Sequence, residues 1–407
     1  ATASVVAVDA AYEVTTDTPV AAYQYSPLHF QIGQTNSYTN DASLLLPEHA
    51  LSGSYMASTW PSWGSGEWIS FFGSPQGEWD YWYPGFVAVA ATVDGTVVTF
   101  TSSTTTAGGT PGALGPGAST QVTLNRGDVM QVFSQIPAAS AAWNLCQTSG
   151  WNYTVSGACP PSFIFPCEVT CAATGGDLTG STVTASQPLA VWAGHKCTYM
   201  PWDDPACDHL EEMMFPTETW GFLSVMTAPR APTGSGVAPT KYRVLALNAG
   251  TQVTFDPAVA PPTTLGAGQF VELETNQDFT VSATNRVYVT QTMLGETALG
   301  GGGGDPAMGS GIPWGQVRST YDFLTPGTYT TNWVNVAATS GATVTLDGVA
   351  VGGWAAIGTT GYQVARVAVT AGAHHMESAG GTGFGITTYG YASFTSYLYP
   401  GGLNFTR

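Results

Sequence analysis

A short phrase recurs three times along this chain, with the form G-[T/A]-x-V-T-[F/L] and starting points at Gly95, Gly250 and Gly341. An alternating apolar stretch precedes each copy: FVAVAAT, YRVLALN and WVNVAAT. Alternation with period two, broken by Gly-rich turns, is typical of half-buried antiparallel strands. The chain is therefore predicted to be built from copies of one small β-module.

Each copy ends in a further apolar stretch, which starts at Thr182, Phe279 and His375. A relative of this stretch starts at Tyr12, without the strands that should precede it. We expect an all-β fold of tandem antiparallel β-sandwich modules with Greek-key-like connections. The alternative is a propeller-like ring of β-modules, in which the N-terminal half-module completes the last module. The predicted domains are an incomplete N-terminal module and three further modules: residues 1–54, 55–217, 218–317 and 318–407.

The first module is predicted to carry an insertion. The first two copies of the phrase start 155 residues apart and the next two 91 residues apart, and the surplus lies mainly between Val132 and Asp177. We therefore expect an insertion over residues 133–176, stapled by its own disulfides because it is too small for an independent core. It contains four of the six cysteines, which allow three pairings: Cys146, Cys159, Cys167 and Cys171.

The remaining cysteines, Cys197 and Cys207, enclose a loop of nine residues and are expected to pair with each other. An even cysteine count in such a chain indicates an oxidising compartment. His195 and His209 flank this pair at a spacing that would also suit zinc, but oxidation of the thiols competes with metal binding. No cofactor is expected. Calcium is the alternative, because the same loop is acidic, although it lacks the D-x-D-x-D-G spacing; the candidate ligands are Asp203, Asp204 and Asp208.

Composition excludes two classes of partner. Nine basic against 27 acidic residues give a net charge of −18, and Lys196 and Lys241 are the only lysines. Nucleic acids and anionic membranes need clustered basic residues, so neither is an expected partner. No apolar run approaches the ~20 residues of a membrane-spanning helix. Charged residues make up 9% of the chain, and such a weakly charged surface suits adhesion or contact with copies of itself.

The densest aromatic segment runs from Trp60 to Tyr83 and is the predicted binding site. Aromatic rings supply a large contact area at low entropic cost, so they suit a protein or glycan partner. The competing interpretation is a hairpin whose rings pack on the core. The candidate binding residues are Trp60, Trp63, Trp68, Trp79, Trp82, Tyr81 and Tyr83.

Two further patterns allow a structural or a functional interpretation. Arg126-Gly127-Asp128 spells the adhesion tripeptide RGD, but the repeat alignment predicts a plain turn there. In addition, three long connections each place one aspartate a few residues before a proline: Asp41 before Pro47, Asp208 before Pro216 and Asp305 before Pro313. Long loops on a rigid β-scaffold are where function usually lies.

Several separated stretches resemble the IgG-Fc-binding-protein N-terminal domain family. They are TPVAAYQYSPL…SYTNDASLLLPEHALSGSYMASTWP, PLAVWAGHKCTYMP…ACDHLEEMMFPTETWG and HHMESAGGTGFGITTYGYASFTSYLYPGG. In the second stretch Cys197, Cys207, Asp208 and His209 stand where the family has them. The resemblance covers nearly the whole chain. It implies a secreted or surface-attached protein that binds other macromolecules, and it brings no catalytic residue with it.

Motifs for catalysis are missing from the sequence: neither a G-x-S-x-G nucleophile elbow nor a G-x-x-x-x-G-K-[S/T] phosphate loop occurs. We therefore predict a non-enzymatic adhesion or binding protein, secreted or on the cell surface, whose partner is an extracellular protein, a glycan or a copy of itself. A chain that starts ATAS fits a mature chain or an excised fragment. The alternative function is a self-assembling subunit of an extracellular filament or sheath, and a secreted glycan-active enzyme is the third.

Overall fold

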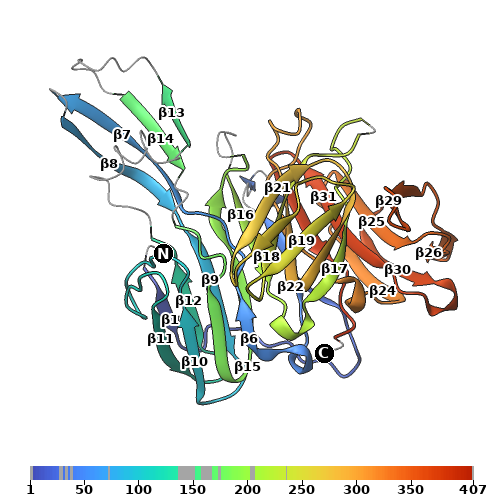
Figure 1. The fold of residues 1–407 in the computed structure, drawn as a ribbon, viewed down its shortest axis with the longest axis horizontal. Coiled ribbons are helices and arrows are strands. Elements are labelled where there is room, and N and C mark those ends of the chain that lie inside the picture. The colour runs from blue at the N-terminus through green and yellow to red at the C-terminus, as the bar shows by residue number, and fades with distance from the viewer. Residues whose placement is uncertain are drawn as a thin grey trace.

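The computed structural model describes residues 3–26, 31–32, 35–36, 40–71, 74–135, 152–156, 167–172, 176–201, 207–234 and 236–405. Side chains are described in these ranges except at 31–36, 65–81, 152–156 and 167–172. The described residues form antiparallel strands joined by turns and short 3-10 helices, which confirms the all-β prediction (Figure 1). In the part of the chain that is described, no helix is long and apolar enough to cross a membrane.

One long strand organises the first module. The first half of β15 (Thr182–Thr198) pairs with β10 and β6, and its second half pairs with β9 and β16. Strand β12 pairs with β9, and β11 pairs with β10. The strands around β15 are β6 (Ser52–Met56), β9 (Gly85–Ala91), β10 (Thr96–Thr101), β11 (Ser119–Leu124), β12 (Val129–Phe133) and β16 (Asp208–Met213).

The second module repeats this pairing scheme around β22 (Phe279–Met293). The first half of β22 pairs with β19 and β17, and the second half pairs with β18 and β23. The other strands are β17 (Gly221–Met226), β18 (Thr240–Ala246), β19 (Thr251–Asp256), β20 (Thr263–Leu265), β21 (Phe270–Thr275) and β23 (Met308–Gly311).

In the third module the long strand is broken in two. Strand β30 (Gly372–Ser378) pairs with β24 and β26, whereas β31 (Gly385–Ala392) pairs with β25 and β32. Between them lies η4 (Ala379–Gly381), so the module consists of two separate sheets. Its other strands are β24 (Thr320–Thr325), β25 (Thr331–Thr339), β26 (Val344–Leu346), β27 (Val349–Ala350), β28 (Ala355–Ile357), β29 (Tyr362–Val369) and β32 (Thr395–Pro400). Greek-key connections stay a prediction.

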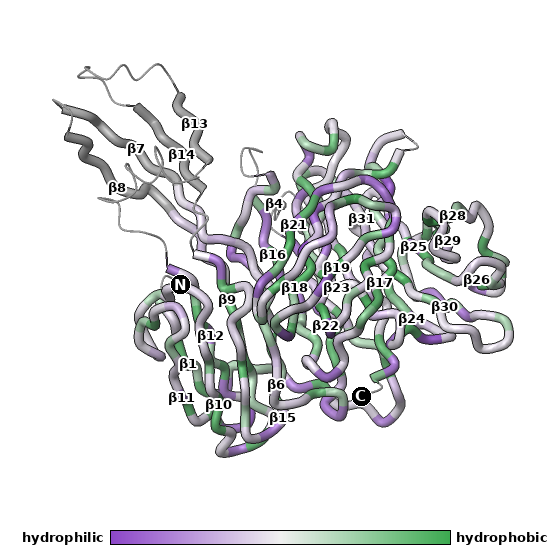
Figure 2. The backbone as a smooth tube through the Cα atoms, viewed as in Figure 1, coloured by the Kyte–Doolittle hydropathy of each residue, from purple (hydrophilic) through white to green (hydrophobic). Residues whose placement is uncertain are grey.

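The repeated phrase has a backbone reason. Its glycines, Gly95, Gly250 and Gly341, all have a positive φ of 68°, 76° and 85°. Glycine adopts this left-handed conformation without the steric cost that a Cβ adds, so each phrase can turn sharply into its strand. In β19 the residues then alternate as the pattern predicts: Val253 and Phe255 are buried, and Gln252 and Thr254 are exposed. Figure 2 shows hydrophobic stretches along the strands that enclose each core.

The N-terminal segment pairs with strands of its own chain. Strand β1 (Val5–Ala7) extends the first module at β12, and β2 (Ala22–Ser26) pairs with β5 (Asp41–Leu45); β3 (Gln31–Ile32) and β4 (Thr35–Asn36) form a separate hairpin. The predicted apolar stretch from Tyr12 is a strand only from Ala22 onward, and Tyr12 itself is fully exposed. The pair β2–β5 corresponds to a pair in the first module: β2 occupies the position of the second half of β15, and β5 occupies the position of β16.

The pair β2–β5 lies between the third and first modules. Tyr23 and Tyr25 donate hydroxyl hydrogen bonds to the carbonyl oxygens of Asp322 and Leu324, at 3.1 and 3.0 Å. On the other side, the Glu211 amide of β16 donates to Asp41 Oδ2 at 3.0 Å. The first module contacts the second, and the second contacts the third, so these bonds complete a closed circuit of modules.

Two arginines, Arg243, which is buried, and Arg366, which is partly buried, join neighbouring modules. Arg243 of the second module donates to Asp177 Oδ2 of the first at 2.7 Å, and its guanidinium lies 3.7 Å from the centre of the Trp60 ring. Arg366 of the third module bonds the Ala228 carbonyl at 3.0 Å and pairs with Asp278 of the second. In both joints the aspartate precedes the long strand of the earlier module, so the joint itself is repeated.

Replacement of Arg243 by Met should lower the free energy of unfolding by about 3–5 kcal/mol, because it leaves the Asp177 carboxylate without its buried partner. Lys241→Met is the matched control, since its ion pairs with Glu272 and Glu274 lie at the surface and are worth about 0.2–1 kcal/mol. Urea unfolding checks both variants. If both variants lost the same free energy of unfolding, the stabilising role of Arg243 at this joint would be contradicted.

Candidate functional site

The aromatic segment and the predicted insertion form one sheet. Its strand order is β13 (Asn152–Ser156), β14 (Cys167–Ala172), β7 (Trp63–Phe71) and β8 (Ser74–Tyr83), and it shares no strand with the described module sheets. Figure 1 shows it extending beyond the first module from the end of β9. We call it the tryptophan sheet. It unites two segments that no sequence pattern had linked.

The insertion starts and ends at neighbouring positions. A Cβ placed on Gly176 would lie 2.8 Å from the Gln135 carbonyl oxygen, so the backbone at these two residues is in close contact. Strand β12 continues through Phe133, which is buried in the first module. Phe133 therefore belongs to the first module, and the predicted insertion over residues 133–176 otherwise stays a prediction.

Two of the predicted binding residues lie inside the protein. Trp60 and Trp63 are 5% and 4% exposed. The Trp63 indole N–H donates to the Cys197 carbonyl at 2.5 Å, and its ring lies 4.2 Å from that of Tyr199 and 5.2 Å from that of Tyr83. For these two tryptophans the competing interpretation, packing on the core, describes the structure. Trp63 packs the base of the tryptophan sheet on the first module, and Trp60 packs in a cluster with residues of the first and second modules.

The other five predicted rings are divided between the two faces by strand register. Directly opposed residues of an antiparallel pair lie on one face, as do alternate residues along a strand. Gly64 opposes Trp82, and beyond a bulge Gly66 opposes Trp79; Trp68 follows on the same face as these glycines. Tyr83 and Tyr81 oppose Trp63 and Ser65 and lie on the opposite face. The side chains of Trp68, Trp79 and Tyr81 lie outside the described residues.

We call the side with Trp68, Trp79 and Trp82 the tryptophan face. Register adds further uncharged residues to it from β14 and β13: Cys167, Val169, Cys171, Tyr153 and Val155. At the base of the sheet, Trp63 packs on the first module from the opposite face. The tryptophan face is therefore turned away from that contact. Sequence reasoning did not predict which residues share this face. The glycines in WGSGEW were the one available signal, because a residue without a side chain leaves space beside a neighbouring ring.

The predicted disulfide is confirmed. Cys197 and Cys207 are bonded, with their Cα atoms 5.2 Å apart. Both thiols are therefore consumed, which overturns the zinc-like arrangement with His195 and His209. Burial lowers the pKa of His195 to about 3, so this ring is neutral, and its Nε2 lies 2.9 Å from the Pro61 carbonyl oxygen. His209 stacks on Phe86 instead.

The calcium alternative stays a prediction. Asp203 and Asp204 lie outside the described residues, and Asp208 is fully buried. Among the residues whose placement is described, no group of three or more His, Cys, Asp or Glu side chains could hold a metal ion.

The RGD tripeptide forms a turn, as predicted. The Asp128 amide donates to the Asn125 carbonyl at 3.0 Å, and Gly127 has a φ of 85°. Asp128 is 6% exposed, and its carboxylate accepts the amides of Asp9 and Asn125. This aspartate is therefore committed to holding the N-terminal segment on the turn and does not present a free carboxylate.

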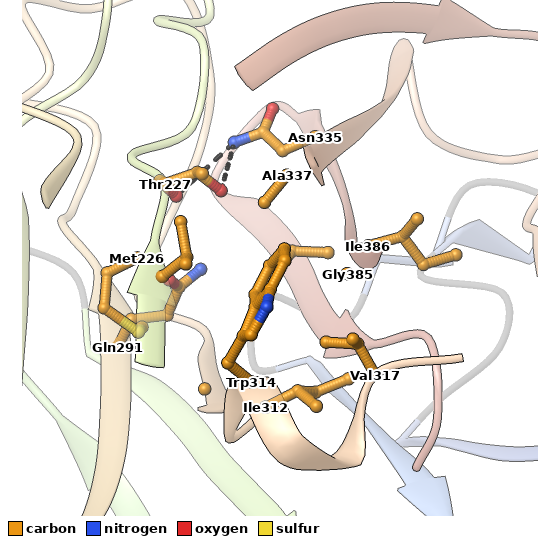
Figure 3. A pocket seen from close by; sticks show the side chains of 13 residues that line it. Met226, Thr227, Gln291, Ile312, Trp314, Val317, Asn335, Ala337, Gly385 and Ile386 are labelled. Atoms are coloured by element: carbon orange, nitrogen blue, oxygen red, sulfur yellow. Dashed lines mark hydrogen bonds between the residues drawn. The ribbon is translucent and has the colours of Figure 1, made fainter. Parts of the chain in front are cut away.

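A small cavity lies between the second and third modules (Figure 3). Half-buried Trp314 lies within it, and Asn335 donates to Thr227 Oγ1 at 3.2 Å across the joint. The cavity offers about 20 Å³ to a water-sized molecule, which is room for about one water. It is a packing defect of the joint and too small for an organic ligand.

Comparison with known proteins identifies the family. The family model "IgGFc binding protein" matches residues 41–390, and the chain belongs to this family of binding proteins. A stretch of 124 residues, 30% of this chain, is 28% identical to the IgGFc-binding protein of Homo sapiens and spans 2% of that protein's length.

Solved structures add nothing to this assignment. An anti-sigma factor domain-containing protein aligns at 7% identity with a TM-score of 0.14, over 52% of this chain and 83% of its own. Another, from Clostridium clariflavum, aligns at 8% identity with a TM-score of 0.12, over 94% of this chain and 98% of its own. Scores this low carry no argument.

The backbone of β14 limits the remaining cysteine pairings. Cys167 and Cys171 stand four residues apart in one extended strand, so their Cα atoms are separated by about 13 Å. A disulfide needs Cα atoms within about 7 Å. We expect each to pair with Cys146 or Cys159. Peptide mapping of unreduced protein checks this, and a Cys167–Cys171 bridge would contradict the strand.

Proposed function

We propose that this protein is an extracellular adhesion or binding protein without enzymatic activity, and that it holds a macromolecular partner on the tryptophan face. The observation that carries the proposal is the register that gathers Trp68, Trp79 and Trp82 on the face turned away from the first module. Membership of a family of binding proteins supports it.

The chemistry of the tryptophan face suits such a partner. Each tryptophan can bury about 150–250 Å² of surface, so three of them supply the core of a standard interface. Register places no charged residue beside them on β14 or β13, so these two strands add no charge that a partner would have to desolvate. On β8, Asp80 is the extra residue at the bulge between Trp79 and Tyr81. A protein surface and the apolar face of a sugar ring both fit these rings.

The test compares two candidates on the tryptophan face with a buried tryptophan. Trp68→Ala and Trp79→Ala should each weaken partner binding about 30-fold, as expected for hot-spot residues, while the melting temperature stays near that of the parent. Trp63→Ala is the control: it should lower stability by about 3–5 kcal/mol, because it leaves a cavity at the base of the sheet.

The probes are immunoglobulin Fc fragment, purified mucin and the chain itself, each titrated against the immobilised protein. If the parent binds one probe and both Trp68→Ala and Trp79→Ala lose that binding, the probe identifies the class of partner. Binding that survives both substitutions, or a large loss of stability in Trp68→Ala and Trp79→Ala, would reject the face.

Self-assembly into a filament or sheath is the second proposal. The observation in its favour is the stretch of residues 12–20 between β1 and β2. It corresponds to the first half of β15 and β22, which pairs on both edges, yet it forms no strand pair with the described residues. Apolar side chains in and just before this stretch are exposed: Val8, Tyr12, Val14 and Val20 are 76%, 102%, 76% and 62% exposed. Unpaired strand-like segments invite strands from a neighbouring molecule.

Light scattering after size exclusion separates the two proposals. A binding protein should elute at the monomer mass, because β2 and β5 already close the circuit within one chain. A filament subunit should elute as polymers that disappear when residues 3–20 are deleted. Polymers that persist in this deletion variant would reject the segment as the assembly edge.

A further inference from the structure

The repeated aspartates of the three long connections meet inside the molecule. Asp41 and Asp208 start the strands β5 and β16, and Asp305 stands three residues before β23. All three are buried, at 2%, 0% and 0% exposure. Strands β5, β16, β23 and β32 contact one another, so the four lie around a common axis through the circuit of modules. In the third module Thr395 and Ser396 stand at the corresponding start of β32.

Polar contacts at the axis cross from module to module. Asp41 Oδ2 accepts the amides of Glu211 in β16 and Met308 in β23, both at 3.0 Å. Asp208 Oδ1 accepts the amide of Asn40 beside β5, and the Asn40 side chain donates to Thr395 Oγ1 of β32. The Asp305 amide donates to Ser396 Oγ at 2.9 Å. The bonds that close the circuit therefore pass through these carboxyl groups.

Balancing cations are missing from the elements at the axis. Strands β5, β16, β23 and β32 read DASLL, DHLEEM, MGSG and TSYLYP, without lysine or arginine. Among the described residues, Glu211 and Glu212 of β16 and Tyr329 of the third module interact electrostatically with the cluster, and His209 follows Asp208 on β16. His209 lies 3.6 Å from Glu211, at a half-buried position. Asp208 Oδ2 is buried, and none of the residues whose placement is described forms a hydrogen bond to it.

Several like charges cannot be buried together without compensation. An unpaired buried carboxylate costs several kcal/mol, and the usual escape is to keep its proton. Burial raises the pKa of Asp208 well above its ordinary value, and Asp305 and Asp41 raise it further. Burial also raises the pKa of Asp41 and Glu212, although hydrogen bonds from Glu211 and Ser310, respectively, act in the other direction.

We propose that the aspartates at the axis are a proton-operated lock on the circuit of modules: protonated, they hold the inner strands together, and when they lose their protons their mutual repulsion loosens the closure. The sign follows from linkage. A carboxyl group whose pKa is raised by folding contributes stability that is complete below its unfolded pKa of about 3.9 and is lost as the pH rises through the folded value.

The test is the pH dependence of unfolding for Asp208→Asn. The amide keeps the shape and the Oδ1 acceptor but carries no charge at any pH. We expect the unfolding equilibrium constants of variant and parent to be similar near pH 4. Above this, the parent should lose stability relative to the variant by up to tenfold in that constant per pH unit. Asp17→Asn, at an exposed position, is the control and should show no such divergence.

If the unfolding equilibrium constants of Asp208→Asn and its parent differed by the same factor at every pH, the proposed lock would be overturned. So would stabilisation of the parent by added calcium chloride that Asp208→Asn loses, because the cluster would then take a cation instead of a proton. If Asp208→Asn does not fold, hydrogen exchange of the parent decides: the Glu211 and Met308 amides should lose protection as the pH rises, beyond the intrinsic pH effect. Unchanged protection would reject the proposal.

Discussion

A long strand that is hydrogen-bonded on both edges along its length is the constraint on which each module depends. In β15 and β22 the two halves pair with different neighbours, so one strand ties both parts of the module together. Unpaired backbone groups are costly when buried, and every other strand is placed by the need to satisfy them. The third module shows that the strand can break, provided that β30 and β31 keep the same partners.

Some of the few charged residues of this chain lie where modules meet. Two of the nine basic residues, Arg243 and Arg366, form the joints between successive modules, and the third connection uses aspartates without a cation. A buried charge pair is directional, and losing one partner is costly, so such joints fix the relative position of neighbouring modules. The tryptophan sheet shares no strand with the other described sheets and takes no part in these joints.

Sequence reasoning succeeded where the signal is local. The phrase glycines, the RGD turn and the Cys197–Cys207 bridge each depend on a few neighbouring residues, and all are present. It was less successful where one residue type suits two environments. Trp60 and Trp63 stand in the same aromatic run as Trp82, yet they are buried because Arg243 and the Cys197 carbonyl lie beside them. Neither neighbour is close in sequence.

The sequence by itself determined the all-β class and the repeated module, because period-two alternation and left-handed glycines act within a few residues. The sequence also showed that each of three long connections contains one aspartate, but it did not indicate that the three lie close together. The tertiary structure alone decided that Asp41, Asp208 and Asp305 meet, that β14 completes the tryptophan sheet, and that β2–β5 fills the gap between the third and first modules. These contacts join residues more than 90 positions apart in the sequence, and no local sequence pattern determines which distant surfaces pack together.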